Sequence, residues 1–154
     1  MTTRALSWVL AFLRIAAGLS LAGAGLHKLG WFTHPALQDV FAQWAAKAHN
    51  PLVAKYLALV APHQSVLSKV VVVGELGLGA LLVAGFLTPM AALLAFLMVA
   101  NFHFASGQMF SLEYLTGQSG LSFLLIFPVL FAGRAGTVLG IDGMLAGQKR
   151  KGGP

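Results

Sequence analysis

The chain has 154 residues, of which 58% are apolar and only 9% charged, and its formal net charge is +6. A soluble domain carries about a quarter charged residues, so most of this chain cannot face water, and we predict a single integral membrane domain. The absence of cysteine excludes disulfides, thiolate metal sites, iron–sulfur clusters and c-type haem. Most basic residues stand at the ends of apolar runs, which indicates contact with lipid headgroups and argues against a nucleic-acid partner.

The first apolar run, residues 6–29, is predicted to cross the membrane, with Trp8 and Trp31 as aromatic anchors near its two ends. A cleavable signal peptide is the alternative, but Arg14 interrupts the apolar region that such a peptide needs. The run also carries several glycines and alanines at helical spacing, among them Gly18. Small residues in this pattern predict close packing against a neighbouring helix.

The segment 34–62 is too polar to span. His34-Pro35 and Asn50-Pro51 each place a capping residue type before a proline, so we predict two short helices, residues 35–49 and 51–61. Apolar residues recur on one side of the first helix and polar residues on the others. This amphipathic insert is therefore expected either to lie on the membrane surface or to cover one end of the bundle.

Residues 66–86 and 89–106 are predicted as the second and third spans, joined by a very short turn. Gly85 is the residue type that ends helices in the left-handed conformation. Thr88 is expected to be the N-cap of the third span, with Pro89 at its first helical position.

The fourth span is predicted at residues 113–132, with Pro128 kinking its far end. Residues 134–154 are rich in glycine and end in a basic run, so we predict a loose basic tail with a short amphipathic piece. The predicted fold is thus all-α: an integral membrane four-helix bundle within residues 1–133, with the amphipathic helical insert between its first and second spans. Four spans place both termini on one side, and the arginines and lysines near them indicate the cytoplasmic side of the inner membrane.

Two ionisable residues, Arg14 and Glu75, lie deep within predicted spans. Each alone would cost on the order of 2.5 to 3.5 kcal/mol at the centre of a span. Their depths differ by roughly one and a half helical turns, which an arginine side chain can bridge. We therefore predict a buried ion pair between them, which either fixes the register of two helices or serves as a proton relay or ligand counter-ion.

Polar residues also gather at the predicted outer ends of the spans, where several phenylalanines surround them. Such a group of hydrogen-bond donors suits a quinone headgroup, whose two carbonyls accept hydrogen bonds and whose reduction needs a proton source near pH 7. Bis-histidine haem ligation and simple exposure of the histidines to lipid headgroups are the alternatives. The predicted quinone site consists of His27, Lys28, Asn101, His103 and Gln118. No metal site and no catalytic residue is predicted.

The order of these residues resembles the DoxX/DoxD family of small four-helix membrane proteins. The residues that carry the resemblance are Arg14 with Gly18, the His27-Lys28 exit, Glu75 with Gly79 and Gly85 ahead of Thr88-Pro89, and the closing Gly140-Ile141-Asp142. The resemblance implies a four-helix bundle and, for the DoxD branch, a membrane subunit of a thiosulfate:quinone oxidoreductase. It also implies that Arg14, Lys28, Glu75 and His103 stand at the family's polar positions.

We therefore predict a quinone-interacting membrane subunit of a redox complex, with the lipid bilayer and other membrane or redox subunits as partners. Electrons would come from a partner protein or a bound reductant. The alternative is a non-catalytic accessory subunit that packs against a larger membrane assembly, and a small transporter is a third reading that so short a chain disfavours. A roof over a pocket containing His27 and His103 would favour the quinone site.

Overall fold

A computed structural model describes residues 3–34, 36–112, 114 and 120–151 of the chain. The described part is built from helices, which confirms the all-α prediction. The α-helices are α1 (Thr3–His27), α2 (Leu37–Lys47), α3 (Pro51–Val60), α4 (Gln64–Ala84), α5 (Thr88–Ala105), α7 (Leu121–Ala132) and α8 (Ile141–Lys151). Short 3₁₀ turns join them at η1 (Leu29–Phe32), η2 (Ala61–His63), η3 (Gln108–Phe110) and η4 (Ala135–Thr137).

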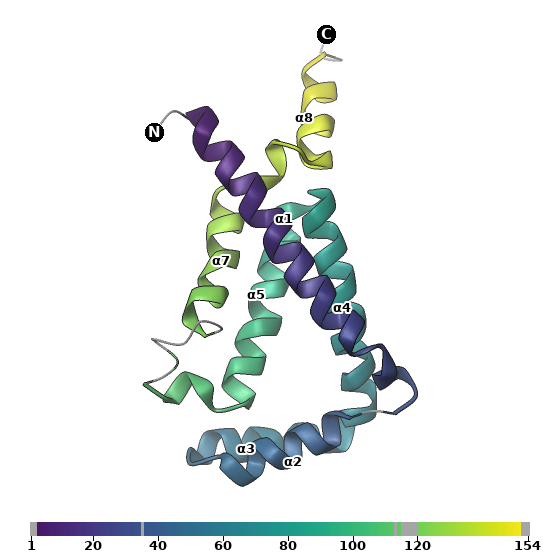
Figure 1. Ribbon diagram of the computed structural model, residues 1–154, viewed down its shortest axis with the longest axis vertical. Coiled ribbons are helices and arrows are strands. Elements are labelled where there is room, and N and C mark those ends of the chain that lie inside the picture. Colours follow the sequence, from purple (N-terminus) through teal and green to yellow (C-terminus); the bar gives the residue numbers. More distant parts are fainter. Residues whose placement is uncertain (1–2, 35, 113, 115–119, 152–154) are drawn as a thin grey trace.

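Helices α1, α4, α5 and α7 run along the long axis of the molecule and form the bundle (Figure 1). Among the described residues, three stretches, Arg4–His27, Pro51–Ala84 and Thr88–Ala105, are long and apolar enough to cross a membrane. The second of them bends at η2, so that α4 is the part that runs along the bundle (Figure 1). Helix α7 has 12 residues, about 18 Å, and is shorter than the hydrocarbon core that it accompanies. The start of the predicted fourth span, at 113 and 115–119, lies outside the described residues. The architecture is that of an integral membrane helical bundle.

Glycines allow α1 and α4 to approach each other closely. A Cβ atom on Gly18 would lie 2.8 Å from the carbonyl oxygen of Gly79, and a Cβ atom on Gly79 would lie 2.7 Å from the backbone nitrogen of Ala22. No larger side chain fits at these two positions without separating the helices. The small-residue face predicted for the first span therefore packs against α4.

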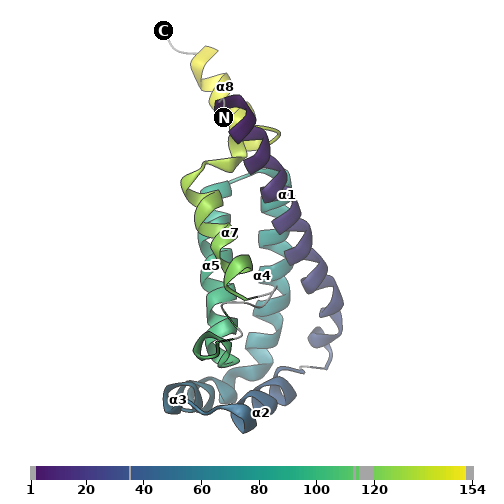
Figure 2. The ribbon, with the colours of Figure 1, turned by 60° about the vertical axis from the view of Figure 1, so that its left-hand side comes forward.

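Helices α2 and α3 lie across one end of the bundle, which we call the roof end (Figures 1 and 2). Their apolar side chains join the end of α5 in one buried cluster that includes Phe41, Val53, Leu57 and Ala105. Asn50 caps α3, as its position before Pro51 suggests, by accepting a hydrogen bond from the backbone N–H of Leu52 at 2.9 Å. The amphipathic insert thus covers the bundle with its apolar side turned inward; Pro35, predicted to open α2, lies outside the described residues.

In the turn between α4 and α5, the end of α4 agrees with the prediction, but the N-cap of α5 does not. Gly85 adopts the left-handed conformation, with φ of 64°. The prediction that Thr88 is the N-cap is wrong, because Thr88 is already helical and Leu87 precedes it in the capping position. The carboxylate of Asp142 caps α5 instead, accepting from the backbone N–H groups of Leu87 at 2.8 Å and Thr88 at 2.9 Å.

Replacing Asp142 with alanine should lower the free energy of unfolding by about 1 to 2 kcal/mol, because two N–H groups at the start of α5 lose their acceptor. Asp142→Asn should cost less, since its amide oxygen keeps one acceptor but loses the negative charge that favours a helix N-terminus. Thermal unfolding of the purified variants in one detergent measures both changes. An alanine variant that melts with the parent would contradict this capping role.

The beginning of α1 and helix α8 are both at the other end of the bundle, which we call the terminal end (Figure 1). The prediction of a loose tail is wrong for its first part. Ala135 and Gly136 are buried, and the backbone N–H of Asp142 donates to the carbonyl oxygen of Gly85 at 2.9 Å. This segment is docked because a buried arginine of α1 binds its carbonyl groups.

Candidate functional site

Arg14 and Glu75 are both buried, but the predicted ion pair between them is not formed. The Arg14 guanidinium donates instead to backbone carbonyl oxygens of the segment after α7. These acceptors are Ala135 at 3.0 Å, Val138 at 3.3 Å and Leu139 at 2.7 Å. Side chains on a helix point back toward its N-terminus, so on the antiparallel helices α1 and α4 Arg14 extends toward the terminal end and Glu75 toward the roof end.

Glu75 is paired with Lys28, the residue directly after α1. The Lys28 Nζ atom donates to Glu75 Oε1 at 2.5 Å. The Glu75 side chain is only 4% exposed, whereas the Lys28 side chain is 27% exposed. Glu75 Oε2 is buried and has no hydrogen-bond partner. A buried carboxylate thus holds an ammonium group that still reaches the protein surface.

Two aromatic rings flank this ammonium. Lys28 Nζ lies 5.8 Å from the centre of the Trp31 ring and 5.9 Å from the centre of the Phe102 ring. Both distances are within the range of cation–π attraction. We call this group of Lys28, Trp31, Glu75 and Phe102 the lysine–glutamate site. It is assembled from the end of α1, from η1, from the middle of α4 and from the last turn of α5.

The other predicted quinone-site residues do not join this group through any contact in the described part of the chain. His27 is exposed, and Asn101 accepts a hydrogen bond from the Tyr56 hydroxyl at 2.5 Å. His103 contacts Tyr114, and Gln118 lies outside the described residues. Successive residues of a helix point about 100° apart, so Asn101 and His103 share a membrane level but not a direction.

His103 and Tyr114 form a separate buried pair. The Tyr114 hydroxyl lies 3.1 Å from His103 Nδ1, and the two rings meet edge to face at 5.3 Å. An ordinary phenol is protonated at neutral pH, so Tyr114 can donate to Nδ1 and leave the ring proton on Nε2. Sequence analysis missed both tyrosines of the chain, Tyr56 and Tyr114. The available signal was that a buried tyrosine hydroxyl needs a polar partner.

His27 and His103, the two histidines of the predicted site, differ in their surroundings. His27 is exposed, whereas His103 is buried and contacts Tyr114. Within the described ranges, no group of three or more histidine, aspartate or glutamate side chains could hold a metal ion. The bis-histidine alternative therefore gains no support from this geometry.

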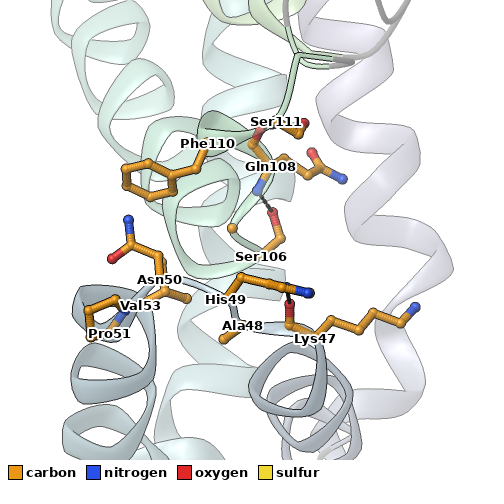
Figure 3. A pocket seen from close by; sticks show the side chains of 11 residues that line it. Lys47, Ala48, His49, Asn50, Pro51, Val53, Ser106, Gln108, Phe110 and Ser111 are labelled. Atoms are coloured by element: carbon orange, nitrogen blue, oxygen red, sulfur yellow. Dashed lines mark hydrogen bonds between the residues drawn. The ribbon is translucent and has the colours of Figure 1, made fainter.

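A pocket of about 570 Å³ lies between the connection of α2 to α3 and the turn from α5 to η3 (Figure 3). Its lining includes His49, Asn50, Ser106 and Gln108. Neither of the two histidines proposed for the quinone site lines it. Helices α2 and α3 thus cover the end of α5, but the pocket beneath them is not the predicted pocket containing His27 and His103.

These features define the class: a small helical membrane protein with an anchored lysine at the roof end of its bundle. A family model described as DoxX matches residues 9–108, and the chain belongs to the DoxX family. The match runs from the first turns of α1 into η3 and includes Arg14, Lys28 and Glu75. No curated protein and no solved structure matches the chain.

Proposed function

We propose that this DoxX-family protein is a quinone-interacting membrane subunit of a redox complex, of the thiosulfate:quinone oxidoreductase kind. The observation that carries the proposal is the Lys28 ammonium, partly exposed, held by a buried carboxylate and flanked by two aromatic rings. Such an ammonium can donate a hydrogen bond to a quinone carbonyl, and the half-buried rings of Trp31 and Phe102 offer apolar contact to the headgroup.

The lysine–glutamate pair also supplies a proton where a reduced quinone needs one. Reduction of a quinone to a quinol takes up two electrons and two protons. Lys28 can give one of the two protons to a reduced oxygen. Water at the exposed side of Lys28 supplies the second proton and reprotonates Lys28, and the Glu75 carboxylate stabilises the restored positive charge. The chain has no cysteine, so a partner subunit or a bound reductant supplies the electrons.

The location of the site suits a ligand that arrives through lipid. Lys28 follows the last residue of α1, and Phe102 lies in the last turn of α5, so the site is near the membrane boundary at the roof end. The exposed arginines Arg4 and Arg134 are at the terminal end. By the rule that basic residues flank spans on the inner side, we place the terminal end in the cytoplasm and the lysine–glutamate site near the outer face of the inner membrane.

Purification from native membranes in a mild detergent, followed by quinone extraction, tests the proposal. We expect bound quinone with the parent chain and a loss of about tenfold or more in Lys28→Ala, since a hydrogen bond from a charged donor contributes about 1.5 to 3 kcal/mol. Lys69→Ala is the matched control, because Lys69 is an exposed lysine of α4. Absence of quinone from the parent, or equal amounts in both variants, would contradict the proposal.

An accessory subunit is the second candidate, and one observation favours it. Gly77 lies on the exposed side of α4 together with Val73 and Ala80, and a Cβ atom on Gly77 would meet nothing within 4 Å. Small residues on an open helix face permit close approach of another membrane helix. The same purification separates the two candidates, because a stoichiometric partner without quinone supports the accessory role.

A further inference from the structure

The terminal end of the bundle exposes a group of large apolar side chains. Leu139, Ile141, Met144 and Leu145 are all exposed, Met144 by 72%. The last three belong to α8 at positions i, i+3 and i+4, so they share one side of that helix. We call these four residues the α8 patch. Exposure of four large apolar side chains to water costs free energy, so we ask what covers this patch.

The hydrogen bonds of Asp142 fix the height of the α8 patch relative to the membrane. They tie the first turn of α8 to Gly85 and to the start of α5. Two membrane-crossing helices reverse direction at this turn, which marks the boundary of the hydrocarbon core. Met144 lies within one helical turn of that level, and α8 continues outward from it (Figure 2). The α8 patch is therefore at the height of the lipid headgroups.

The charge around the patch is positive. Arg4 and Arg134 are exposed at this end, and α8 finishes with the sequence Lys149-Arg150-Lys151. The described carboxylate at the terminal end, Asp142, is occupied by two backbone N–H groups. An apolar patch at headgroup height, followed within two turns by three basic residues, is complementary to anionic lipid.

We propose that α8 binds anionic phospholipid, with its patch in the headgroup layer and its basic end directly outside this layer, within range of the anionic surface potential. Near an anionic surface each basic residue contributes roughly a fivefold gain in lipid affinity. Three such residues make the preference for anionic over neutral lipid large enough to measure. The proposal is independent of quinone binding, because the lysine–glutamate site lies at the opposite end of the bundle.

The absence of cysteine allows a direct test on the full chain. A nitroxide is attached at Met144→Cys or, as a control, at Ala146→Cys, an exposed position about 200° further around the helix. Each chain is reconstituted in phosphatidylcholine with or without phosphatidylglycerol. With phosphatidylglycerol, the label at 144 should be more accessible to oxygen than to a water-soluble nickel complex, and the label at 146 should show the reverse.

Two further results decide the proposal. Replacing Lys149, Arg150 and Lys151 together with glutamine should reduce the phosphatidylglycerol retained by the purified chain by about tenfold or more. A label at 144 that is wet in both lipids, or equal retention of phosphatidylglycerol by the parent and the glutamine variant, would overturn the proposal. Labelled chains are compared only where their melting temperature equals that of the parent, and Leu145→Cys replaces Met144→Cys if it does not.

Discussion

Replacing Arg14 with alanine should lower the free energy of unfolding by about 3 kcal/mol or more, one of the largest effects of any single substitution in this chain. Arg14 is fully buried and binds three carbonyl oxygens between Ala135 and Leu139. Without the guanidinium those acceptors lose their donors and a cavity opens beneath the docked segment. Water cannot easily replace the donors within an apolar bundle. Thermal unfolding in a single detergent measures the loss.

Arg14→Lys is the first control for this result. A lysine keeps the positive charge, but its compact ammonium cannot present the planar fork with which the guanidinium reaches three carbonyl groups. Its stability should therefore fall between those of the parent and the alanine variant. A lysine variant as stable as the parent would show that charge alone is sufficient.

Limited trypsin digestion separates this role from the Arg14–Glu75 pair that the sequence predicted. Arg14→Ala should speed cleavage after Arg134, because the segment that follows Arg134 loses its anchor. Glu75→Gln should disturb Lys28 at the roof end and leave that cleavage rate unchanged. Equal acceleration in both variants would instead indicate that Arg14 and Glu75 act as a pair.

The failure of the predicted pair shows what sequence spacing can and cannot provide. The apolar runs correctly indicated that Arg14 and Glu75 are buried, but the predicted nearness in depth is wrong. The Arg14 guanidinium lies beside Gly85, ten residues along α4 from Glu75, which is about 15 Å. Spacing did not give the direction in which each side chain extends, which is opposite for two antiparallel helices. Nor could it reveal acceptors 121 or more residues away, which are backbone carbonyls without a residue-specific signature. The Asp142 cap was missed for the same reason, since it lies 54 residues beyond Thr88.

The candidate site was predicted only in part, and the reason for the wrong part is related. Lys28 was included, Trp31 was predicted as an aromatic anchor, and phenylalanines were expected around the site, of which Phe102 is one. The error was to assume that residues at one membrane level meet. His103 is two positions beyond Asn101 on α5, so their side chains lie about 200° apart and find different tyrosines. Level follows from hydropathy, whereas direction requires the packing of all the helices.

Gly85→Ala should destabilise the chain by about 3 kcal/mol and reduce the yield of folded protein. Gly85 has φ of 64°, where a side chain costs about 1 to 2 kcal/mol. A Cβ atom there would also overlap Arg14 Nη1 and lie 2.6 Å from the Cα atom of Gly140. Arg14 cannot move aside without losing its carbonyl acceptors. Melting temperature and yield after size-exclusion chromatography measure the effect.

Two matched variants separate the causes of this loss. Gly77→Ala places the same methyl group on an exposed helical glycine with nothing within 4 Å, and should be neutral or stabilising by up to about 1 kcal/mol. Gly85→Asn tolerates the left-handed backbone better but still carries the Cβ atom against Arg14. If Gly85→Asn is as unstable as Gly85→Ala, contact with Arg14 dominates. If it approaches the parent, backbone conformation dominates and the close packing around Arg14 must be looser than the structure shows.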